Sequence, residues 1–292
     1  TIKEGEGKSK YPMQLAQGST FNGFFNNYDG LASGLQPIGV KYDDASRKVV
    51  CTLEQDDIMD GLNWLHKWYQ DGIINPDANV VTDGGKGSIF GSAQGWPAAA
   101  TTWAFNAGIE KYDLTQVFGP LYTTETIQGS MNAISANSKY KTEALKVLQL
   151  MNTDSKFRDM CAYGTEGNYM EYAEDGTVQK LRDDWNWPTY TQGTFFILST
   201  QADGDPDAWN QVKEQNESAV SSTCLGFALD VTNIQNEIAN CNTVWDKYKN
   251  DLLTGASDPA TAVPACIEEL KAAGLETVIE EAQKQVDEFF AN

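Results

Sequence analysis

The chain has 292 residues, and its 41 acidic residues outnumber its 21 basic residues, which gives a formal net charge of −20. This charge opposes binding to the phosphate backbone of nucleic acids and to an anionic membrane surface. No apolar run approaches the roughly 20 residues that span a bilayer, and the length allows one or two domains with a sizeable core.

The N-terminal part is predicted to form a β-hairpin and then a long helix. An extended run at residues 37–42, a polar turn at 43–48 and a second extended run at 49–50 indicate the hairpin. Thr52 and Gln55 have the spacing of a helix-capping box. Apolar residues then recur with helical spacing until Gly72, at Ile58, Leu62, Leu65, Trp68 and Tyr69.

The middle of the chain is predicted to contain two short strands and then a helix. One strand is expected at residues 116–118 and the other in the alternating run at 131–134. A helix is predicted after the Asn137-Ser138 turn, because the apolar residues there have a spacing that places them on one stripe of a helix. The residues of that stripe are Ala144, Val147, Leu148 and Met151.

A second helix and a hairpin are predicted to follow directly. Asp154 is placed to cap this helix, and Gly164 is placed to end it. Its inward-facing residues are expected to be Phe157, Met160 and Cys161. The Asp175-Gly176 pair then predicts a hairpin turn.

The C-terminal third is predicted to be helical. A stripe runs from Ile234 to Leu252 and is closed by Gly255. Asp258-Pro259 has the cap and first-turn proline of a further helix, which Pro264 is expected to restart. The last helix is expected to bury Val278, Ile279, Ala282, Val286 and Phe289.

The densest mixture of aromatic and hydrogen-bonding side chains lies at residues 183–196. Flat aromatic faces cover the C–H surfaces of sugars while polar groups hold the hydroxyls, so this composition suits a carbohydrate. Trp185 and Trp187 alternate, so at most one of them packs into the core of an extended segment. Core packing and solute contact therefore remain alternatives for this pair.

The residue pattern gives no support for metal or cofactor chemistry. The five cysteines are widely scattered and lack metal-ligand spacing. The single histidine, His66, cannot supply a catalytic triad or a His-based metal site. Neither a cofactor nor a metal ion is expected.

Four segments carry a resemblance to a known family. After a predicted strand come an S-A-N-S turn at 135–138, an E-A-L-K-V-L-Q-L-M-N-T-D helix at 143–154 and a Y-G-x-E-G loop at 163–167. Residues 270–275 precede a final helix rich in Gln, Glu and Lys. In this order the segments resemble the extracellular solute-binding lipoproteins of bacterial ABC importers, family 1-like, with a C-terminal domain of unknown function.

The resemblance implies a helix-rich α/β fold of the periplasmic-binding-protein type II, with two lobes and a solute cleft between them. Because such proteins are longer, the chain is expected to be the C-terminal portion of the fold, with most of the first lobe absent. Residues 1–118 are expected to begin the C-terminal lobe, 119–165 to return to the N-terminal lobe, and 166–292 to complete the C-terminal lobe with a helical tail.

The resemblance and the aromatic composition together indicate ligand-binding residues. Trp96 belongs to a glycine-rich segment that lies at the cleft in the resembling family, and Glu166 belongs to the Y-G-x-E-G loop. The residues expected to contact solute are Phe21, Asn22, Trp96, Gln128, Tyr163, Glu166, Trp185, Trp187 and Tyr190.

The expected function is that of an extracellular solute-binding component that binds a sugar or oligosaccharide and delivers it to an ABC permease. The alternatives are a carbohydrate-active enzyme and a carbohydrate-binding module. An enzyme would use paired acids, such as Asp183 with Asp184 or Glu166 with Glu171. Adjacent carboxylates on a strand point to opposite faces, and acids are abundant here, so solvated surface acids are favoured and no enzyme is expected.

The resemblance also implies an extracellular, cell-surface lipoprotein. The chain starts at Thr1 without a secretion signal, so the anchor is expected in an N-terminal region absent from it. Residues 128–151 would then lack the cover of the missing lobe. The piece is therefore expected either to self-associate through this region or to fold it differently.

Overall fold

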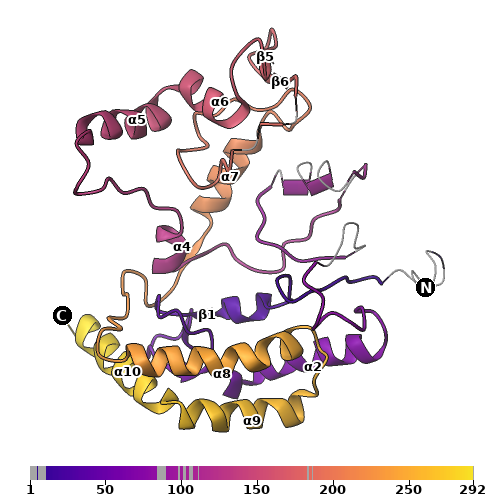
Figure 1. The fold of residues 1–292 in the computed structure, drawn as a ribbon, viewed down its shortest axis with the longest axis vertical. Coiled ribbons are helices and arrows are strands. Elements are labelled where there is room, and N and C mark those ends of the chain that lie inside the picture. Colours follow the sequence, from indigo (N-terminus) through magenta and orange to yellow (C-terminus); the bar gives the residue numbers. More distant parts are fainter. Residues whose placement is uncertain are drawn as a thin grey trace. The chain divides into compact units, whose positions relative to one another are not determined.

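The computed structural model contains two compact units (Figure 1). It describes residue 5 and residues 11–83, 90–97, 99–100, 103–104, 108–110, 112–182, 184–185 and 187–291. The first unit comprises residues 1–94, 121–126 and 220–292, and the second comprises 95–120 and 127–219. The chain therefore passes from one unit to the other at four boundaries, after residues 94, 120, 126 and 219.

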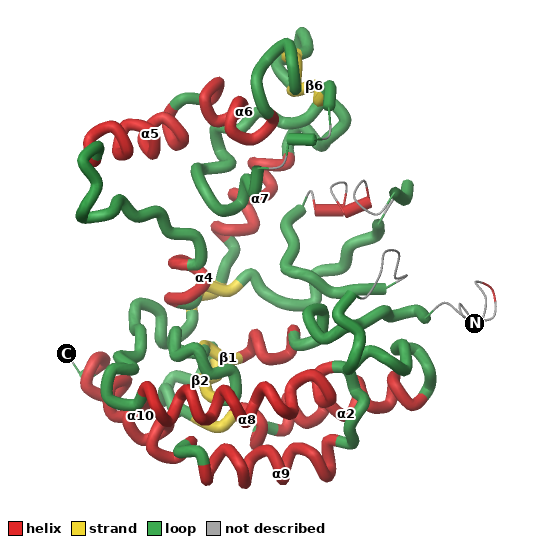
Figure 2. Tube along the Cα trace, viewed as in Figure 1, coloured by secondary structure: helices red, strands yellow, loops and turns green. Residues whose placement is uncertain are grey.

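Helices are the main regular elements of the first unit (Figure 2). They are α2 (Asp56–Gln70), α8 (Gln235–Leu253), α9 (Pro259–Ala272) and α10 (Leu275–Phe290). Helix α8 packs against each of the other three. Its side chains at Ile238, Cys241, Trp245 and Leu252 are buried, which confirms the stripe predicted for this helix and explains why it lies at the centre of the group.

A small antiparallel sheet completes the core of the first unit. Strand β2 (Ile38–Lys41) lies between β1 (Tyr28–Asp29) and β3 (Val50–Cys51). Ile38 is paired with Cys51 across β2 and β3, so the predicted hairpin is confirmed. Ile38, Val40 and Cys51 share one buried cluster with the residues of α8, α9 and α10.

The capping box predicted at Thr52 and Gln55 is wrong. A 3-10 turn, η2 (Thr52–Glu54), occupies this position, and α2 begins at Asp56 without a side-chain cap. The Gln55 amide donates instead to the carbonyl of Cys51 at 3.1 Å. Helix α2 ends at Gln70, two residues before the predicted stop at Gly72.

Two details of the C-terminal helices also differ from the prediction. Helix α9 continues through Pro264 without a restart. Proline removes the backbone N–H that would bond to the carbonyl of Ala260, but Val263 and Cys266 beside it are buried, and their packing holds the helix together. Phe289 is 50% exposed, because it lies in the last turn of α10, where the helix reaches the surface.

The two strands predicted in the middle of the chain are not formed. Residues 116–118 are irregular, and β4 (Leu121–Tyr122) follows them, paired in parallel with β7 (Val220–Ser221). Residues 131–134 are also irregular. A strand requires a neighbour for its backbone N–H and C=O groups, and no described strand pairs with this run. Helix α4 (Thr124–Gln128) lies between the two segments.

The second unit contains a helix pair, a hairpin and a further helix. Helix α5 (Lys141–Thr153) packs against α6 (Ser155–Tyr163). Strand β5 (Met170–Tyr172) pairs with β6 (Val178–Lys180) in antiparallel register, which confirms the predicted hairpin, and α7 (Ala208–Glu217) follows. A buried cluster joins these elements through Ala162, Tyr163, Met170, Val178 and Leu198.

The buried face of α6 differs from the predicted one. Met160, expected inside, is 39% exposed, and Phe157 and Cys161 are only partly buried. The residues that are buried instead are Arg158, Asp159, Ala162 and Tyr163. Two charged residues thus replace the expected apolar ones, and their hydrogen bonds, described below, explain how the core accommodates them.

Candidate functional site

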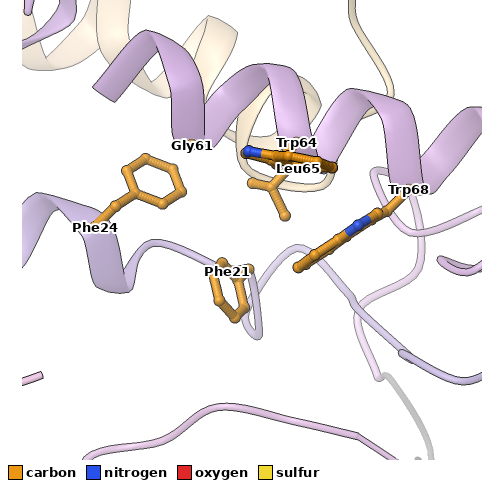
Figure 3. A pocket seen from close by; sticks show the side chains of 6 residues that line it. All are labelled: Phe21, Phe24, Gly61, Trp64, Leu65 and Trp68. Carbon is orange, nitrogen blue, oxygen red and sulfur yellow. The ribbon is translucent and has the colours of Figure 1, made fainter. Parts of the chain in front are cut away.

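An aromatic pocket of about 350 Å³ opens on helix α2 of the first unit (Figure 3). Its lining consists of Phe21, Phe24, Gly61, Trp64, Leu65 and Trp68. Trp64 and Trp68 are four residues apart on α2, a spacing that brings their side chains to one side of the helix. Phe21 lies just before the 3-10 turn η1 (Gly23–Asn27), and Phe24 lies within it.

The rings of the aromatic pocket are held by close packing. A Cβ atom at Gly61 would lie 2.8 Å from the ring of Phe24, so glycine is needed for this ring to approach the helix. Phe21 lies edge-on to Trp68, with ring centroids 6.3 Å apart. The backbone N–H of Phe21 donates to the carbonyl of Leu253 at 3.1 Å. The pocket is therefore supported by α2, η1 and the end of α8.

The aromatic pocket presents ring faces and few polar groups. Its lining carries no charged side chain, and the Trp64 and Trp68 indole groups are its side-chain hydrogen-bond donors. Trp64 is 57% exposed, so one large ring faces solvent. Such a surface can cover the C–H face of a sugar ring, but the hydroxyl groups would need partners from outside the pocket.

A second concentration of aromatic residues, the aromatic segment, is described at 184–185 and 187–196 in the second unit. The indole N–H of Trp185 donates to the carbonyl of Cys161 at 3.0 Å, and its ring lies 5.2 Å from that of Tyr169. Trp187 is partly buried, and its indole nitrogen has no partner among the described residues. Tyr190 is 73% exposed.

Arg158 of α6 holds the aromatic segment through its backbone. The side chain is fully buried, and it donates from Nε to the carbonyl of Thr194 at 3.0 Å and from Nη2 to that of Thr189 at 2.9 Å. Burial lowers the pKa of Arg158 from its ordinary value, although a guanidinium group stays charged in proteins. The two carbonyl groups therefore partly compensate a buried positive charge.

Asp159 holds the chain just beyond the aromatic segment. Its carboxylate accepts from the backbone N–H of Ser199 at 2.9 Å, from the Ser199 hydroxyl at 2.7 Å and from the Tyr172 hydroxyl at 2.9 Å. Burial and then this hydrogen bond raise the pKa of Tyr172. Arg158 and Asp159, adjacent on α6, thus fix the aromatic segment and the chain just beyond it. This arrangement orders the exposed side chains of the segment in advance of any ligand.

In the described part of the chain, no group of three or more His, Cys, Asp or Glu side chains is arranged to hold a metal ion. No helix in the described ranges is long and apolar enough to cross a membrane.

Comparison with known proteins shows which proteins the chain resembles. A family described as "Domain of unknown function (DUF3502)" matches residues 223–291. A "Carbohydrate ABC transporter substrate-binding protein" of Streptococcus pneumoniae is 28% identical over 285 residues, which cover 91% of this chain. The crystal structure of the N-glycan transport solute binding protein (NgtS) from Streptococcus pneumoniae matches the whole chain with a TM-score of 0.84 at 26% identity. Over nearly its whole length, the chain is therefore similar to solute-binding proteins of ABC transporters.

The same comparisons show how much of a solute-binding protein the chain represents. It spans 57% of the length of the curated Streptococcus pneumoniae relative and 66% of the NgtS chain. NgtS structures in complex with Man1GlcNAc and with Man5GlcNAc match with TM-scores of 0.82 and 0.77. The predicted resemblance to solute-binding proteins and the helix-rich α/β fold are confirmed.

Both of these similar proteins are named as transport components rather than as enzymes. The enzyme alternative is therefore set aside. Of the acids proposed for it, Asp183 lies outside the described residues, and Asp184, Glu166 and Glu171 are all exposed. Asp184 pairs with Arg182. These positions are typical of solvated surface acids.

The predicted ligand-binding residues divide between the two units of the chain. Phe21 and Asn22 belong to the first, where Phe21 lines the aromatic pocket and Asn22 is exposed at the start of η1. The seven others belong to the second unit. Their role in binding remains a prediction.

Within the second unit, these residues have different environments. Trp96 is partly buried and lies edge-on to Trp103, with ring centroids 5.9 Å apart. Tyr163 is buried, and its hydroxyl donates to the carbonyl of Ser199 at 2.8 Å. Gln128 and Glu166 are exposed. Tyr163 thus lies on α6 and Trp185 is hydrogen-bonded to the same helix, whereas Tyr190 projects into solvent.

The sequence analysis missed Trp64 and included Trp68 only among the apolar residues with helical spacing. Helical spacing does place Trp68 near Leu65, but both line the aromatic pocket rather than only the core. The signal available in the sequence was the pair of tryptophans four residues apart on an amphipathic helix. Arg158 and Asp159 were also missed, because charged residues are normally assigned to exposed faces.

Proposed function

We propose that the intact protein binds a carbohydrate and delivers it to an ABC permease. The observation that carries this proposal is the match of the whole chain to NgtS, at 26% identity and a TM-score of 0.84. NgtS is an N-glycan transport protein with structures in complex with Man1GlcNAc and Man5GlcNAc. Oligosaccharides of mannose and N-acetylglucosamine are therefore the first candidates for the solute.

The two aromatic features support a sugar over a peptide or an amino acid. The exposed rings of Trp64 in the aromatic pocket and Tyr190 in the aromatic segment are available to stack on pyranose rings. The aromatic segment also carries hydroxyl and amide side chains that can hold hydroxyl groups. We propose Phe21, Trp185, Trp187 and Tyr190 as the leading contacts, with Asn22, Trp96, Gln128, Tyr163 and Glu166 as the remaining candidates.

Calorimetric titration tests the proposal. The intact protein is titrated with Man1GlcNAc, with larger mannose and N-acetylglucosamine oligosaccharides, with unrelated glycans, and with peptides and amino acids. Saturable binding of at least one glycan, with no binding of peptides, is expected. Tight binding restricted to peptides or amino acids would overturn the proposal.

The cellular setting follows from the same family assignment. We propose an extracellular lipoprotein that docks on a membrane permease, with no nucleic acid as a partner. Its lobes are proposed to divide as residues 1–118 and 166–292 in one lobe and 119–165 in the other. Fractionation of the producing bacterium checks the location, since recovery of the protein only in the cytosol would contradict it.

A further inference from the structure

A polar pocket of about 450 Å³ lies in the second unit, apart from the residues assigned to solute above. Its walls come from the turn of the β5–β6 hairpin, from residues 196–200 and from the start of α7. We propose that this polar pocket is a subsite for one neutral sugar residue of a bound glycan. The inference rests on the proposed carbohydrate function and adds a location that the sequence did not indicate.

The polar pocket has a volume suited to a small ligand. Small-molecule sites typically enclose about 300–1,000 Å³ and combine apolar surface with a few convergent polar groups. Phe196, which is 53% exposed, and Trp209 provide aromatic surface in the lining. Asp175, Thr177, Thr200 and Asn210 provide oxygen and nitrogen atoms. This is the combination that sugar recognition requires, because a pyranose has both C–H faces and hydroxyl groups.

The walls of the polar pocket are fixed to one another by backbone hydrogen bonds. The N–H of Val178 donates to the carbonyl of Thr200 at 2.8 Å, and the N–H of Ala202 donates to the carbonyl of Val178 at 2.9 Å. The ring of Trp209 stacks on Phe195 with centroids 4.8 Å apart at 26°. Asp159 fixes Ser199, as described above. The pocket is therefore largely formed before a ligand arrives, which reduces the entropy lost on binding.

The polar groups of the pocket retain capacity for further hydrogen bonds. Asp175 accepts from the N–H of Thr177 at 2.9 Å and from its hydroxyl at 2.7 Å, in both cases through Oδ1. These bonds lower the pKa of Asp175, so the carboxylate is ionised at neutral pH. Its Oδ2 and the hydroxyl of Thr200 have no hydrogen bond to another described residue, and both can therefore accept from or donate to sugar hydroxyls.

The charge of Asp175 narrows the class of ligand. Its ionised carboxylate repels an acidic sugar, so a sialic or uronic acid residue is disfavoured. A neutral hexose or N-acetylhexosamine fits this condition.

Variants of the full chain test the polar pocket by calorimetry and saturation-transfer NMR with Man1GlcNAc and the methyl glycosides of mannose and N-acetylglucosamine. Phe196→Ala removes the exposed ring, Thr200→Val removes one hydroxyl, and Asp175→Asn keeps the turn acceptor while removing charge. We expect Phe196→Ala to raise the Kd about tenfold and the other two to raise it severalfold. Leu181→Ala and Glu174→Gln, which change exposed residues outside the pocket, should leave the Kd unchanged.

Each outcome of this experiment decides the proposal. Equal thermal unfolding midpoints of the variants and the wild type show that a raised Kd reflects lost contacts. If the wild type binds Man1GlcNAc and all three pocket variants keep its Kd, the subsite is wrong while the proposed carbohydrate function stands. If the wild type binds none of these sugars and none of the larger glycans, the subsite and the proposed function both fail.

Discussion

Arg158 and Asp159 are two charged residues buried at 0% and 1% exposure in the interior of the second unit. Burial of a charge is unfavourable unless hydrogen bonds compensate it. Asp159 accepts three hydrogen bonds, and Arg158 donates two. Because these bonds reach residues 189–199, the two side chains serve to order the aromatic segment rather than to bind solute directly.

Replacement of Arg158 should destabilise the second unit. In Arg158→Met the carbonyls of Thr189 and Thr194 lose their donors while remaining largely enclosed. We expect the free energy of unfolding to fall by about 3 kcal/mol, measured by urea denaturation followed through tryptophan fluorescence. Lys146→Met, which changes an exposed residue of α5, serves as the control. Equal stability of the two variants would contradict the anchoring role of Arg158.

The buried thiols predict a loss of stability at high pH. Burial raises the pKa of Cys266 to about 12 and that of Cys51 to about 11. In the unfolded chain these thiols lose their protons near pH 9, at a lower pH than in the folded protein. The contribution of the buried thiols to the free energy of unfolding is therefore complete below pH 9 and disappears as the pH rises through 11 to 12. We expect the unfolding free energy to fall between pH 9 and 11, and to fall less steeply in Cys266→Ala. An unchanged slope in that variant would refute this assignment.

At the scale of single elements, helix α6 depends on its cap. Asp154 accepts from the backbone N–H of Phe157 at 2.9 Å, as predicted from its position before the helix, and Gly164 ends the helix with φ of +90°. The cap satisfies one of the N–H groups left without partners in the first turn. Since α6 carries Arg158 and Asp159, a frayed first turn would also loosen the aromatic segment.

Removal of the α6 cap has a defined expected cost. Asp154→Ala should lower the free energy of unfolding by about 1 kcal/mol, measured by thermal and urea denaturation. Asp154→Asn retains a side-chain acceptor and should restore most of this loss. If the alanine and asparagine variants are equally stable, the carboxylate does not act as a cap.

At the scale of the whole molecule, α5 and the segment before it leave apolar side chains in solvent. Met131 is 74% exposed, Tyr140 69%, Leu145 60% and Val147 47%. Of the four stripe residues predicted on α5, Val147 is exposed, Ala144 and Leu148 are partly buried and Met151 is buried. Apolar surface of this kind on a soluble protein is a typical contact site for another chain.

The chain is therefore expected to self-associate through α5. Sedimentation velocity should show a concentration-dependent increase in the average sedimentation coefficient, because association covers the exposed side chains. Leu145→Lys combined with Val147→Lys should shift the protein toward the monomer. Leu181→Lys, at a residue of the same unit that is 44% exposed, should have no effect. A strictly monomeric wild type at high concentration would contradict this prediction.

The intact protein is expected to close its two lobes on bound solute. A ligand that contacts both lobes stabilises the closed form and shifts the population toward it, which would let a permease distinguish the loaded from the empty protein. Small-angle scattering of the intact protein should show a smaller radius of gyration with saturating glycan than without it. An identical radius in the two states would argue against closure.

The amino-acid sequence by itself determined the features that depend on neighbouring residues. The Asp154 cap, the β2–β3 and β5–β6 hairpins and the buried stripe of α8 all follow from local spacing and turn chemistry. The resemblance to solute-binding proteins was also visible in the sequence, because the turn, helix and loop segments that carry it are each local stretches of the chain.

Tertiary structure decided the features that depend on distant partners. The run at 131–134 alternates like a strand but finds no described neighbour, and α9 continues through Pro264 because packing beside it outweighs a lost hydrogen bond. Arg158 and Asp159 became interior residues only because residues 189–199 fold over them. Both pockets likewise combine segments far apart in sequence, and no local pattern encodes such contacts, since their energies arise only when the chain brings those segments together.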